Sequence, residues 1–462
     1  MSWMDHVGSW LRDRLIRNRR VNSARVVALG FGALIVLGTL LLSLPIASRD
    51  GQSVGLVNSL FTVTSATCVT GLIVVDTQIH WTLFGQVVLL LLIQLGGLGF
   101  MTVFSLVSFA LRRRIGLAER MIMASTFNLN DLDGVVRMVR RALMGTFFLE
   151  GAGAVLLSFR FVPQFGVPGG IWRGIFHAVS AFCNAGFDLM GERYGAFSSL
   201  EGYNNDPYVL GVLICLITVG GLGFFVWEDI ATTRSWKKLT LYSKMVLALS
   251  GFLLLGGAAF YFFAEHGNLL TLGNMPPWQA ALNALFESVT LRTAGFAAFP
   301  QGGLREASMA LTCILMLIGG SSGSTAGGLK TVTVFVLLLG LRSSLAGREQ
   351  VTFRGRAIPH RQVINAMTLC LIALSLFFVG SISISMVEGI SYLDAAFETA
   401  SAIGTVGVTT GITPSLSLYS RLILVGLMYL GRVGILSVSV AFLTRTGGSL
   451  KIKYPDLDVM IG

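Results

Sequence analysis

Residues 61–72 read FTVTSATCVTGL, and three later stretches are built in the same way. These stretches are FHAVSAFCNAGF at 176–187, FESVTLRTAGF at 286–296 and FETASAIGTVGV at 397–408. Each begins with phenylalanine, and each ends in a glycine that is followed by an apolar residue. Alignment on that glycine gives four equivalent positions, Gly71, Gly186, Gly295 and Gly407. The chain therefore contains a fourfold internal repeat.

Apolar runs flank every one of these peptides. A helix crosses the hydrocarbon core of a bilayer with roughly 20 apolar residues. Eight runs are long enough, near 26–47, 81–111, 138–161, 208–227, 244–264, 309–341, 363–387 and 416–443. The four segments that carry the glycine peptides are too short to cross, so we expect them to form re-entrant half-helices.

Each repeat consists of a membrane span, a half-helix, a glycine peptide and a second span, in that order. We expect an all-α polytopic membrane protein in which four pseudo-symmetric units supply eight transmembrane helices and four re-entrant pore helices around one central pore. The predicted boundaries are a cytoplasmic N-terminus at 1–25, repeats at 26–111, 138–230, 242–341 and 362–445, and a cytoplasmic C-terminus at 446–462.

The composition agrees with a membrane protein. Of the 462 residues, 53% are hydrophobic and 12% are charged, whereas a soluble globular chain carries about 25% charged residues. These values exclude a soluble enzyme, a disordered chain and a fibrous protein. The formal net charge of +11 falls in short loops between the apolar runs, so it indicates membrane topology and no nucleic-acid partner.

Basic residues precede the first run and follow the second, fourth, sixth and eighth runs. By the positive-inside rule these segments are cytoplasmic, so we expect a multi-pass protein of the cell (plasma or inner) membrane with both termini in the cytoplasm. The basic loops at 112–120 and 342–361 also offer a docking surface for a cytosolic partner. The alternative is that they only fix topology and contact anionic lipid.

The glycine peptides are candidates for lining a cation pathway. Non-helical backbone at membrane depth persists only where it is buried in protein or lines a wet cavity. Four equivalent peptides around an axis meet this condition, and their carbonyl oxygens can replace the hydration shell of a cation. Glycine suits such turns because other residues disfavour the backbone angles. Close helix packing is the alternative role for these glycines, but the fourfold recurrence favours the pore.

The sixth run is interrupted by the stretch GGSSGSTAGG at 319–328. Each glycine in a helix costs about 1 kcal/mol relative to alanine, so we expect a broken helix with an intramembrane loop that acts as a movable barrier. A flexible packed helix is the alternative. Enzyme motifs are disfavoured here, because no strand precedes the G-x-S-x-G match and Leu329 breaks the P-loop spacing before Lys330.

Arg432 lies inside the eighth run with apolar residues on both sides. A charge at this depth is costly, so we expect Arg432 to face a cavity or a partner rather than lipid. Snorkelling and a structural ion pair are the alternatives. Glu150 is the other clear charge within a run, and the sequence assigns it no role.

These residues resemble the Ktr/Trk/HKT superfamily of potassium transporters, and in particular the KtrB type of membrane subunit from bacterial Ktr systems. The resemblance covers 26–443. It rests on TSATCVTGL, SAFCNAGFD, RTAGF and GTVGVT, which look like filter peptides, and on GGSSGSTAGGLK, which looks like a gating segment. Trk-type relatives often carry two extra N-terminal spans, and none is expected here, which favours the Ktr branch.

The resemblance implies uptake of K⁺, often dependent on Na⁺ as an activating ion, by a homodimer with one pore per subunit. It also implies regulation by a cytosolic nucleotide-binding ring similar to KtrA. The implied K⁺ filter consists of Thr67, Cys68, Val69, Thr70, Gly71, Cys183, Asn184, Ala185, Gly186, Arg292, Thr293, Ala294, Gly295, Gly404, Thr405, Val406 and Gly407. The implied gate consists of Gly319, Gly320, Ser321, Ser322, Gly323, Ser324, Thr325, Ala326, Gly327, Gly328 and Arg432.

Two other functions remain open for a polytopic chain. A Na⁺-coupled organic-solute symporter is expected to have inverted repeats and two broken helices, whereas these repeats are parallel and one run is clearly broken. A membrane-embedded enzyme is disfavoured because the five histidines are scattered, without an HExxH motif or paired carboxylates. The chain also lacks a Rossmann fingerprint, so we expect nucleotide control to come from a separate protein.

Overall fold

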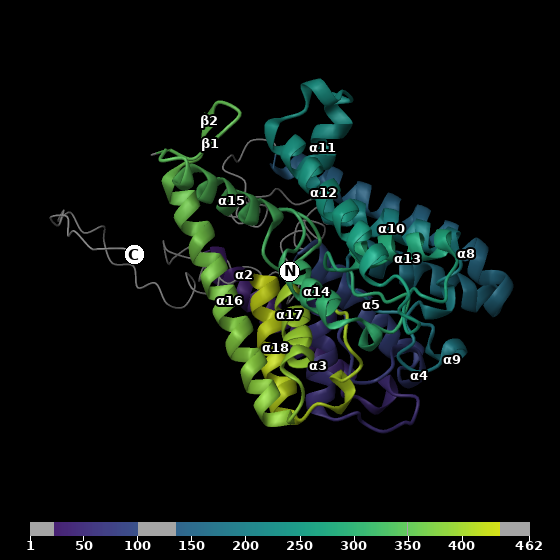
Figure 1. Cartoon of the computed structure of the whole chain (residues 1–462). Coiled ribbons are helices and arrows are strands. Elements are labelled where there is room, and N and C mark those ends of the chain that lie inside the picture. The colour runs from purple at the N-terminus through teal and green to yellow at the C-terminus, as the bar shows by residue number, and fades with distance from the viewer. Residues whose placement is uncertain (1–22, 100–134, 349, 435–462) are drawn as a thin grey trace, which may run out of the picture.

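The computed structural model describes residues 23–99, 135–348 and 350–434, and these residues are mostly helical. In Figure 1 the purple helices near the N-terminus lie beside the yellow helix near the C-terminus, and their contacts agree. The predicted cytoplasmic residues 1–22, 112–120 and 446–462 lie outside the described residues.

The first two repeats differ in how their half-helices begin. In the first repeat, a loop separates α2 (Ser23–Leu42) from the half-helix α3 (Leu56–Thr67), and α5 (Leu83–Leu98) follows. In the second repeat, span and half-helix run together as α8 (Val135–Phe182) across a kink at Gly166, whose φ is 75°. Prolines on both sides of this glycine remove helix hydrogen bonds and favour the kink.

The later elements follow the predicted order. The second repeat ends with α10 (Pro207–Leu222) and α11 (Phe224–Thr233). The third repeat contains α12 (Leu241–Ala264), the half-helix α13 (Pro277–Thr290), α14 (Glu306–Leu317) and α15 (Thr331–Leu345). The fourth contains α16 (His360–Glu388), the half-helix α17 (Tyr392–Gly404) and α18 (Leu418–Val433). Short elements connect them: α4 (Thr77–His80), α9 (Gly191–Tyr194) and the antiparallel hairpin of β1 (Thr352–Phe353) and β2 (Arg356–Ala357).

The half-helices share one packing rule. Each packs on the span before it, in the pairs α2 with α3, α12 with α13 and α16 with α17, while the two parts of α8 are continuous. Each also contacts the span that closes the preceding repeat, in the pairs α5 with α8, α10 with α13, α14 with α17 and α18 with α3. The last pair joins the fourth repeat to the first, so the four units close into a ring.

The phenylalanine that leads each repeated peptide has a structural role in this ring. Its side chain is fully buried in all four half-helices, at Phe61, Phe176, Phe286 and Phe397. Close packing of side chains is what holds helices together where no water is available to be released. The leading phenylalanine therefore anchors each half-helix against its neighbours.

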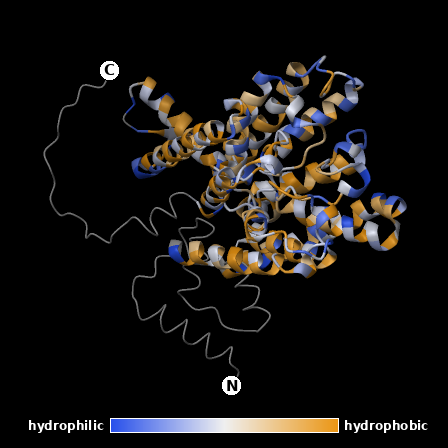
Figure 2. Cartoon of the chain, turned by 90° about the horizontal axis from the view of Figure 1, so that it is seen from below, coloured by the Kyte–Doolittle hydropathy of each residue, from blue (hydrophilic) through white to orange (hydrophobic). Residues whose placement is uncertain are grey.

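Several described helices are long and apolar enough to cross a membrane. They are 25–42, 136–182, 241–264 and 360–388, and the bent pair α10 and α11 would be a fifth. Figure 2 shows apolar residues along the helices, with hydrophilic residues gathered near several helix ends and loops. The expected runs 81–111 and 416–443 continue into residues outside the described ranges, so the full number of eight spans stays a prediction.

The fourth run departs from the sequence expectation. We expected one clearly broken run, but the structure also breaks 208–227, because α10 and α11 meet at an angle of 97°. The break lies at Gly223, whose φ of 94° favours glycine. The Phe224 N–H turns away from its own helix and donates to the Gly323 carbonyl of the intramembrane stretch at 2.9 Å. The number of broken helices therefore does not distinguish this fold from that of a symporter.

Candidate functional site

The four repeat glycines lie together in one ring. All four have positive φ angles, 101° at Gly71, 70° at Gly186, 85° at Gly295 and 97° at Gly407. A β-carbon added to Gly71 would lie 2.6 Å from the Ala185 carbonyl oxygen, and one added to Gly186 would lie 2.8 Å from that of Ala294. One added to Gly295 would lie 2.5 Å from the Val406 carbonyl oxygen, and one added to Gly407 would meet that of Thr70. The glycines are therefore required both by conformation and by space.

The residue two places before each glycine is also left-handed. These residues are Val69, Asn184, Thr293 and Thr405, with φ of 57°, 58°, 73° and 51°. Non-glycine residues seldom adopt this conformation, and such strain clusters at functional sites. The same unusual turn is thus built four times around the ring.

Backbone N–H groups tie the glycine peptides to their half-helices. Thr70 N donates to the Ser65 carbonyl at 2.8 Å, and Val406 N donates to the Ser401 carbonyl at 2.8 Å. The N–H of the following glycine then donates to the same serine's hydroxyl, at 3.0 Å for Gly71 and 2.9 Å for Gly407. Since the N–H groups are used on the helix side, the carbonyl groups are left to face the neighbouring peptides. Sequence reasoning missed these serines, although both precede their glycine by six residues.

The half-helices end where the glycine peptides begin. The helix caps are Cys68 for α3, Leu291 for α13 and Thr405 for α17, and α8 ends at Phe182. The C-terminus of a helix carries partial negative charge on its free carbonyls. The helix ends and the carbonyl oxygens of Thr70, Ala185, Ala294 and Val406 therefore lie near one another. Backbone carbonyl oxygens of this kind can replace the hydration shell of a cation.

The stretch 319–328 is a non-helical loop between α14 and α15, as predicted. It is held to the second repeat, because Ser321 N donates to the Gly221 carbonyl at 3.1 Å and Thr325 Oγ1 donates to the Phe182 carbonyl at 3.1 Å. A β-carbon on Gly328 would lie 3.0 Å from the Gly404 carbonyl oxygen, so the loop also contacts the fourth glycine peptide. The end of the loop, at Gly327 and Gly328, therefore lies against the predicted filter residues Thr405 and Gly404.

Arg432 reaches this loop from α18. Its Nη1 donates to the Thr325 carbonyl, and its Nη2 donates to the carbonyls of Gly96 at 2.5 Å and Gly97 at 2.9 Å. The guanidinium thus connects the loop to the end of α5 and does not face lipid. Its positive charge therefore lies between the loop and the end of α5.

A second polar cluster lies behind the second glycine peptide. Gln94 Nε2 donates to both Glu150 carboxylate oxygens, at 3.0 and 3.1 Å, and Cys183 Sγ lies 3.7 Å from Glu150 Oε1. Gly97 near the end of α5 lies close by, since a β-carbon on it would lie 2.6 Å from Cys183 Sγ. Glu150 is therefore hydrogen-bonded next to the second glycine peptide. Its position in an apolar run does not predict this contact.

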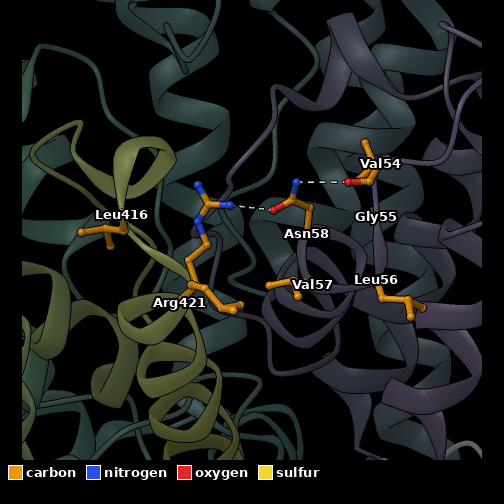
Figure 3. A pocket seen from close by; sticks show the side chains of 8 residues that line it. Val54, Gly55, Leu56, Val57, Asn58, Leu416 and Arg421 are labelled. Carbon is orange, nitrogen blue, oxygen red and sulfur yellow. Dashed lines mark hydrogen bonds between the residues drawn. The ribbon is translucent and has the colours of Figure 1, made fainter.

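A cavity of about 380 Å³ opens between the start of α3 and the start of α18. Figure 3 shows Arg421 and Asn58 facing each other across it, and Arg421 Nη1 donates to Asn58 Oδ1 at 2.7 Å. Arg421 Nη2 also donates to the Pro414 carbonyl at 2.8 Å. This pair connects the first repeat to the fourth at the ring's closing contact.

We expect Arg421→Ala to destabilise the folded protein by about 2 kcal/mol, because two hydrogen bonds from a charged donor are lost. The measurement is the midpoint of thermal unfolding in detergent, with Arg356→Ala on the exposed β2 strand as the control. The midpoint should fall for Arg421→Ala alone. An equal midpoint for both variants would show that the contact contributes nothing to closure.

The chain is similar to known cation transport proteins over nearly its whole length. The model of the family TrkH, described as a cation transport protein, matches residues 7–448. The potassium/sodium uptake protein NtpJ of Enterococcus hirae is 41% identical over 451 residues, covering 96% of this chain and 98% of that protein. The Ktr system potassium uptake protein B of Bacillus subtilis is 38% identical over 453 residues, covering 98% and 99%.

A solved structure agrees at the level of the fold. The potassium transporter TrkH from Vibrio parahaemolyticus superposes with a TM-score of 0.71 at 17% identity, over 90% of this chain and 83% of that one. The resemblance seen in the sequence is confirmed, and so is the prediction that the chain is a membrane transporter and not an enzyme. The chain belongs to the TrkH family of cation transport proteins.

Proposed function

We propose that this chain takes up K⁺ across the cell membrane through the ring formed by its four glycine peptides. The single observation that carries the proposal is the ring itself, in which four carbonyl groups before four left-handed glycines meet at one place. The names of the relatives in Enterococcus hirae and Bacillus subtilis state potassium uptake, which supports K⁺ as the cargo. The loop 319–328 and Arg432 form the gate in this proposal.

The proposed architecture has eight transmembrane helices and four re-entrant pore helices around one pore, with both termini in the cytoplasm. The contact ring of half-helices and spans supports this arrangement. We also propose that the chain forms a homodimer in the lipid bilayer and that Na⁺ activates the uptake. The word sodium in the name of the Enterococcus hirae relative supports the Na⁺ dependence.

The test is growth of a cell that lacks its own K⁺ uptake systems. Expression of the chain should restore growth at low external K⁺, and added Na⁺ should increase the rate of Rb⁺ uptake. Rescue by an organic solute together with Na⁺, in the absence of K⁺ uptake, would instead establish the symporter. Absence of both activities from membranes that contain the protein would overturn the K⁺ proposal.

Nucleotide control should come from a separate ring-forming protein similar to KtrA. The relative from Bacillus subtilis is named as part of a Ktr system, which supports a partner for this chain. The described part of the basic segment 342–361 carries Arg342 at the end of α15 and the exposed hairpin of β1 and β2, which together offer it a docking surface.

We expect the purified chain alone not to bind ATP, ADP or NADH, and a soluble ring-forming protein to co-purify with it from its native cells. Equilibrium dialysis with each labelled nucleotide and size-exclusion chromatography of the complex measure the two results. Replacing Arg354 and Arg356 by alanine should weaken co-purification without changing the amount of protein in the membrane. Tight nucleotide binding by the chain alone would contradict the two-component arrangement.

A further inference from the structure

The residue after the leading phenylalanine of a half-helix is polar and fully buried in every repeat. These residues are Thr62, His177, Glu287 and Glu398. In three of the four repeats, its side chain accepts a hydrogen bond from the segment that leaves the glycine peptide. We call these segments the flanks: residues 187–190, 296–301 and 408–413.

Glu398 makes the most extensive of these connections. Its Oε1 accepts from the Thr410 N–H at 3.1 Å and from the Thr409 hydroxyl, and its Oε2 accepts from the Thr413 hydroxyl at 2.6 Å. The Thr413 hydroxyl also lies 2.9 Å from that of Thr409. Every partner comes from the flank that begins directly after Gly407.

Glu287 repeats the connection in the third repeat. Its Oε2 accepts from Gln301 Nε2 at 3.0 Å, and Gln301 lies at the end of the flank that follows Gly295. The next residue, Gly302, contacts the fourth flank, because its added β-carbon would lie 2.9 Å from the Thr410 carbonyl oxygen. The two buried glutamates therefore hold two flanks that touch each other.

His177 makes the equivalent connection in the second repeat, with a ring nitrogen as acceptor in place of a carboxylate oxygen. Leu189 N donates to its Nε2 at 3.4 Å, and its Nδ1 lies 2.8 Å from the Arg173 carbonyl oxygen. These two partners assign the proton to Nδ1. The ring also stacks on Phe296, the residue after Gly295, with ring centres 6.4 Å apart and planes at 24°. The second half-helix thus contacts the start of the third flank.

The first repeat provides an internal comparison. Thr62 occupies the equivalent place, yet its hydroxyl makes no hydrogen bond to any described residue. Among the described residues, the first repeat therefore lacks the polar connection at this position that the other three repeats have.

We propose that His177, Glu287 and Glu398 are positioning residues that hold the flanks of the glycine ring, and that Glu398 thereby sets the preference of the ring for K⁺ over Na⁺. This inference rests on the proposed function. A carbonyl ring discriminates between cations only while its oxygens keep their spacing and number. The glycine peptide is fixed to its half-helix on one side, and Glu398 fixes it to the same half-helix on the other side.

The experiment compares Rb⁺ uptake and its inhibition by Na⁺ in cells that lack other K⁺ uptake systems. The variants are Glu398→Gln, which keeps one acceptor oxygen, Glu398→Ala, which keeps none, and Thr413→Val, which removes one donor. Glu388→Gln is the matched control, because Glu388 accepts from Ser417 N and from two serine hydroxyls at the start of α18, away from the glycine ring. Protein amount in the membrane is measured for each variant.

We expect Glu398→Ala to lower the preference for Rb⁺ over Na⁺ by about tenfold or more, because three hydrogen bonds to the fourth flank are lost together. Thr413→Val and Glu398→Gln should lower it by smaller factors, and the double variant Thr413→Val with Glu398→Ala should be no worse than Glu398→Ala alone. Glu388→Gln should leave the preference unchanged. If Glu398→Ala does not reach the membrane, Thr413→Val and Glu398→Gln carry the test.

An unchanged ion preference would overturn the inference, and Gly407→Ser then shows whether the proposed filter is lost as well. A reduced uptake rate with an unchanged ion preference in every folded Glu398 and Thr413 variant would show that these residues only support the fold. If Gly407→Ser changes the preference in the same assay, the proposed filter stands and the positioning role alone is lost. If Gly407→Ser also leaves the preference unchanged, the filter assignment fails together with this inference.

Discussion

Replacing Gly407 by serine is expected to lower the preference for K⁺ over Na⁺ by about tenfold or more while the protein still inserts. At φ of 97° a residue with a β-carbon is strained, which costs about 1–2 kcal/mol. The β-carbon would also meet the Thr70 carbonyl oxygen of the next peptide and force it to move. Since one displaced oxygen alters the whole ring, the ion preference should change more than the stability.

The measurement is Rb⁺ uptake in proteoliposomes with Na⁺ as competitor, at matched protein content. Gly426→Ser is the control, because Gly426 lies in the neighbouring helix α18 and its added β-carbon has open space around it. Gly295→Ser should behave as Gly407→Ser does, since its added β-carbon meets the Val406 carbonyl oxygen at 2.5 Å. An unchanged preference in both ring variants would remove the filter assignment.

Replacing Arg432 by alanine is expected to raise K⁺ flux by about tenfold. Arg432 donates to Thr325 in the loop and to Gly96 and Gly97 at the end of α5, and each hydrogen bond from a charged donor contributes about 1.5–3 kcal/mol. Loss of about 1.4 kcal/mol from a barrier raises a rate tenfold. Removal of the positive charge from beside the ring acts in the same direction, because it no longer repels the cation.

The flux is measured as K⁺ or Rb⁺ uptake into vesicles at matched protein content, with the exposed Arg361→Ala at the start of α16 as the control. Shortening the loop within 319–328 should have the same direction of effect as Arg432→Ala. Arg432→Lys should give an intermediate flux, since lysine keeps the charge but cannot reach three carbonyls as a planar fork does. Flux at or below that of the unchanged chain in both alanine and shortened variants would indicate plain packing.

The order of the elements was predictable because the repeat is written in the sequence. Phenylalanine, a half-helix and a glycine recur four times, and the structure places all four glycines in one ring. The break in 319–328 was predictable because consecutive glycines and serines weaken a helix. The break at Gly223 was not, although Gly220, Gly221 and Gly223 lie close together, because glycine is common in membrane helices and the φ of Gly223 depends on the loop that receives the Phe224 N–H.

The hydrogen-bond partners of the buried polar residues could not be predicted from the sequence either. Glu150 is visible as a charge in an apolar run, but Gln94 lies 56 residues away in the chain and Cys183 lies 33 residues away. The direction of Arg432 was expected from the cost of facing lipid, whereas its connection to Gly96, 336 residues earlier, requires the fold. Contacts between repeats are set by the closure of the ring, which no local pattern records.

The contact of α18 with α3 has a consequence for how the protein is made. Asn58 and Arg421, which form the hydrogen bond at this contact, are 363 residues apart in the chain. During synthesis, α3 therefore cannot form its contact with α18 until α18 has been made and has entered the membrane. Contacts of such sequence separation form late, because the loop between them must first be ordered. A chain that stops before α18 still packs α3 on α2 and α5, but the side of α3 that α18 contacts stays without its partner, so the ring does not close.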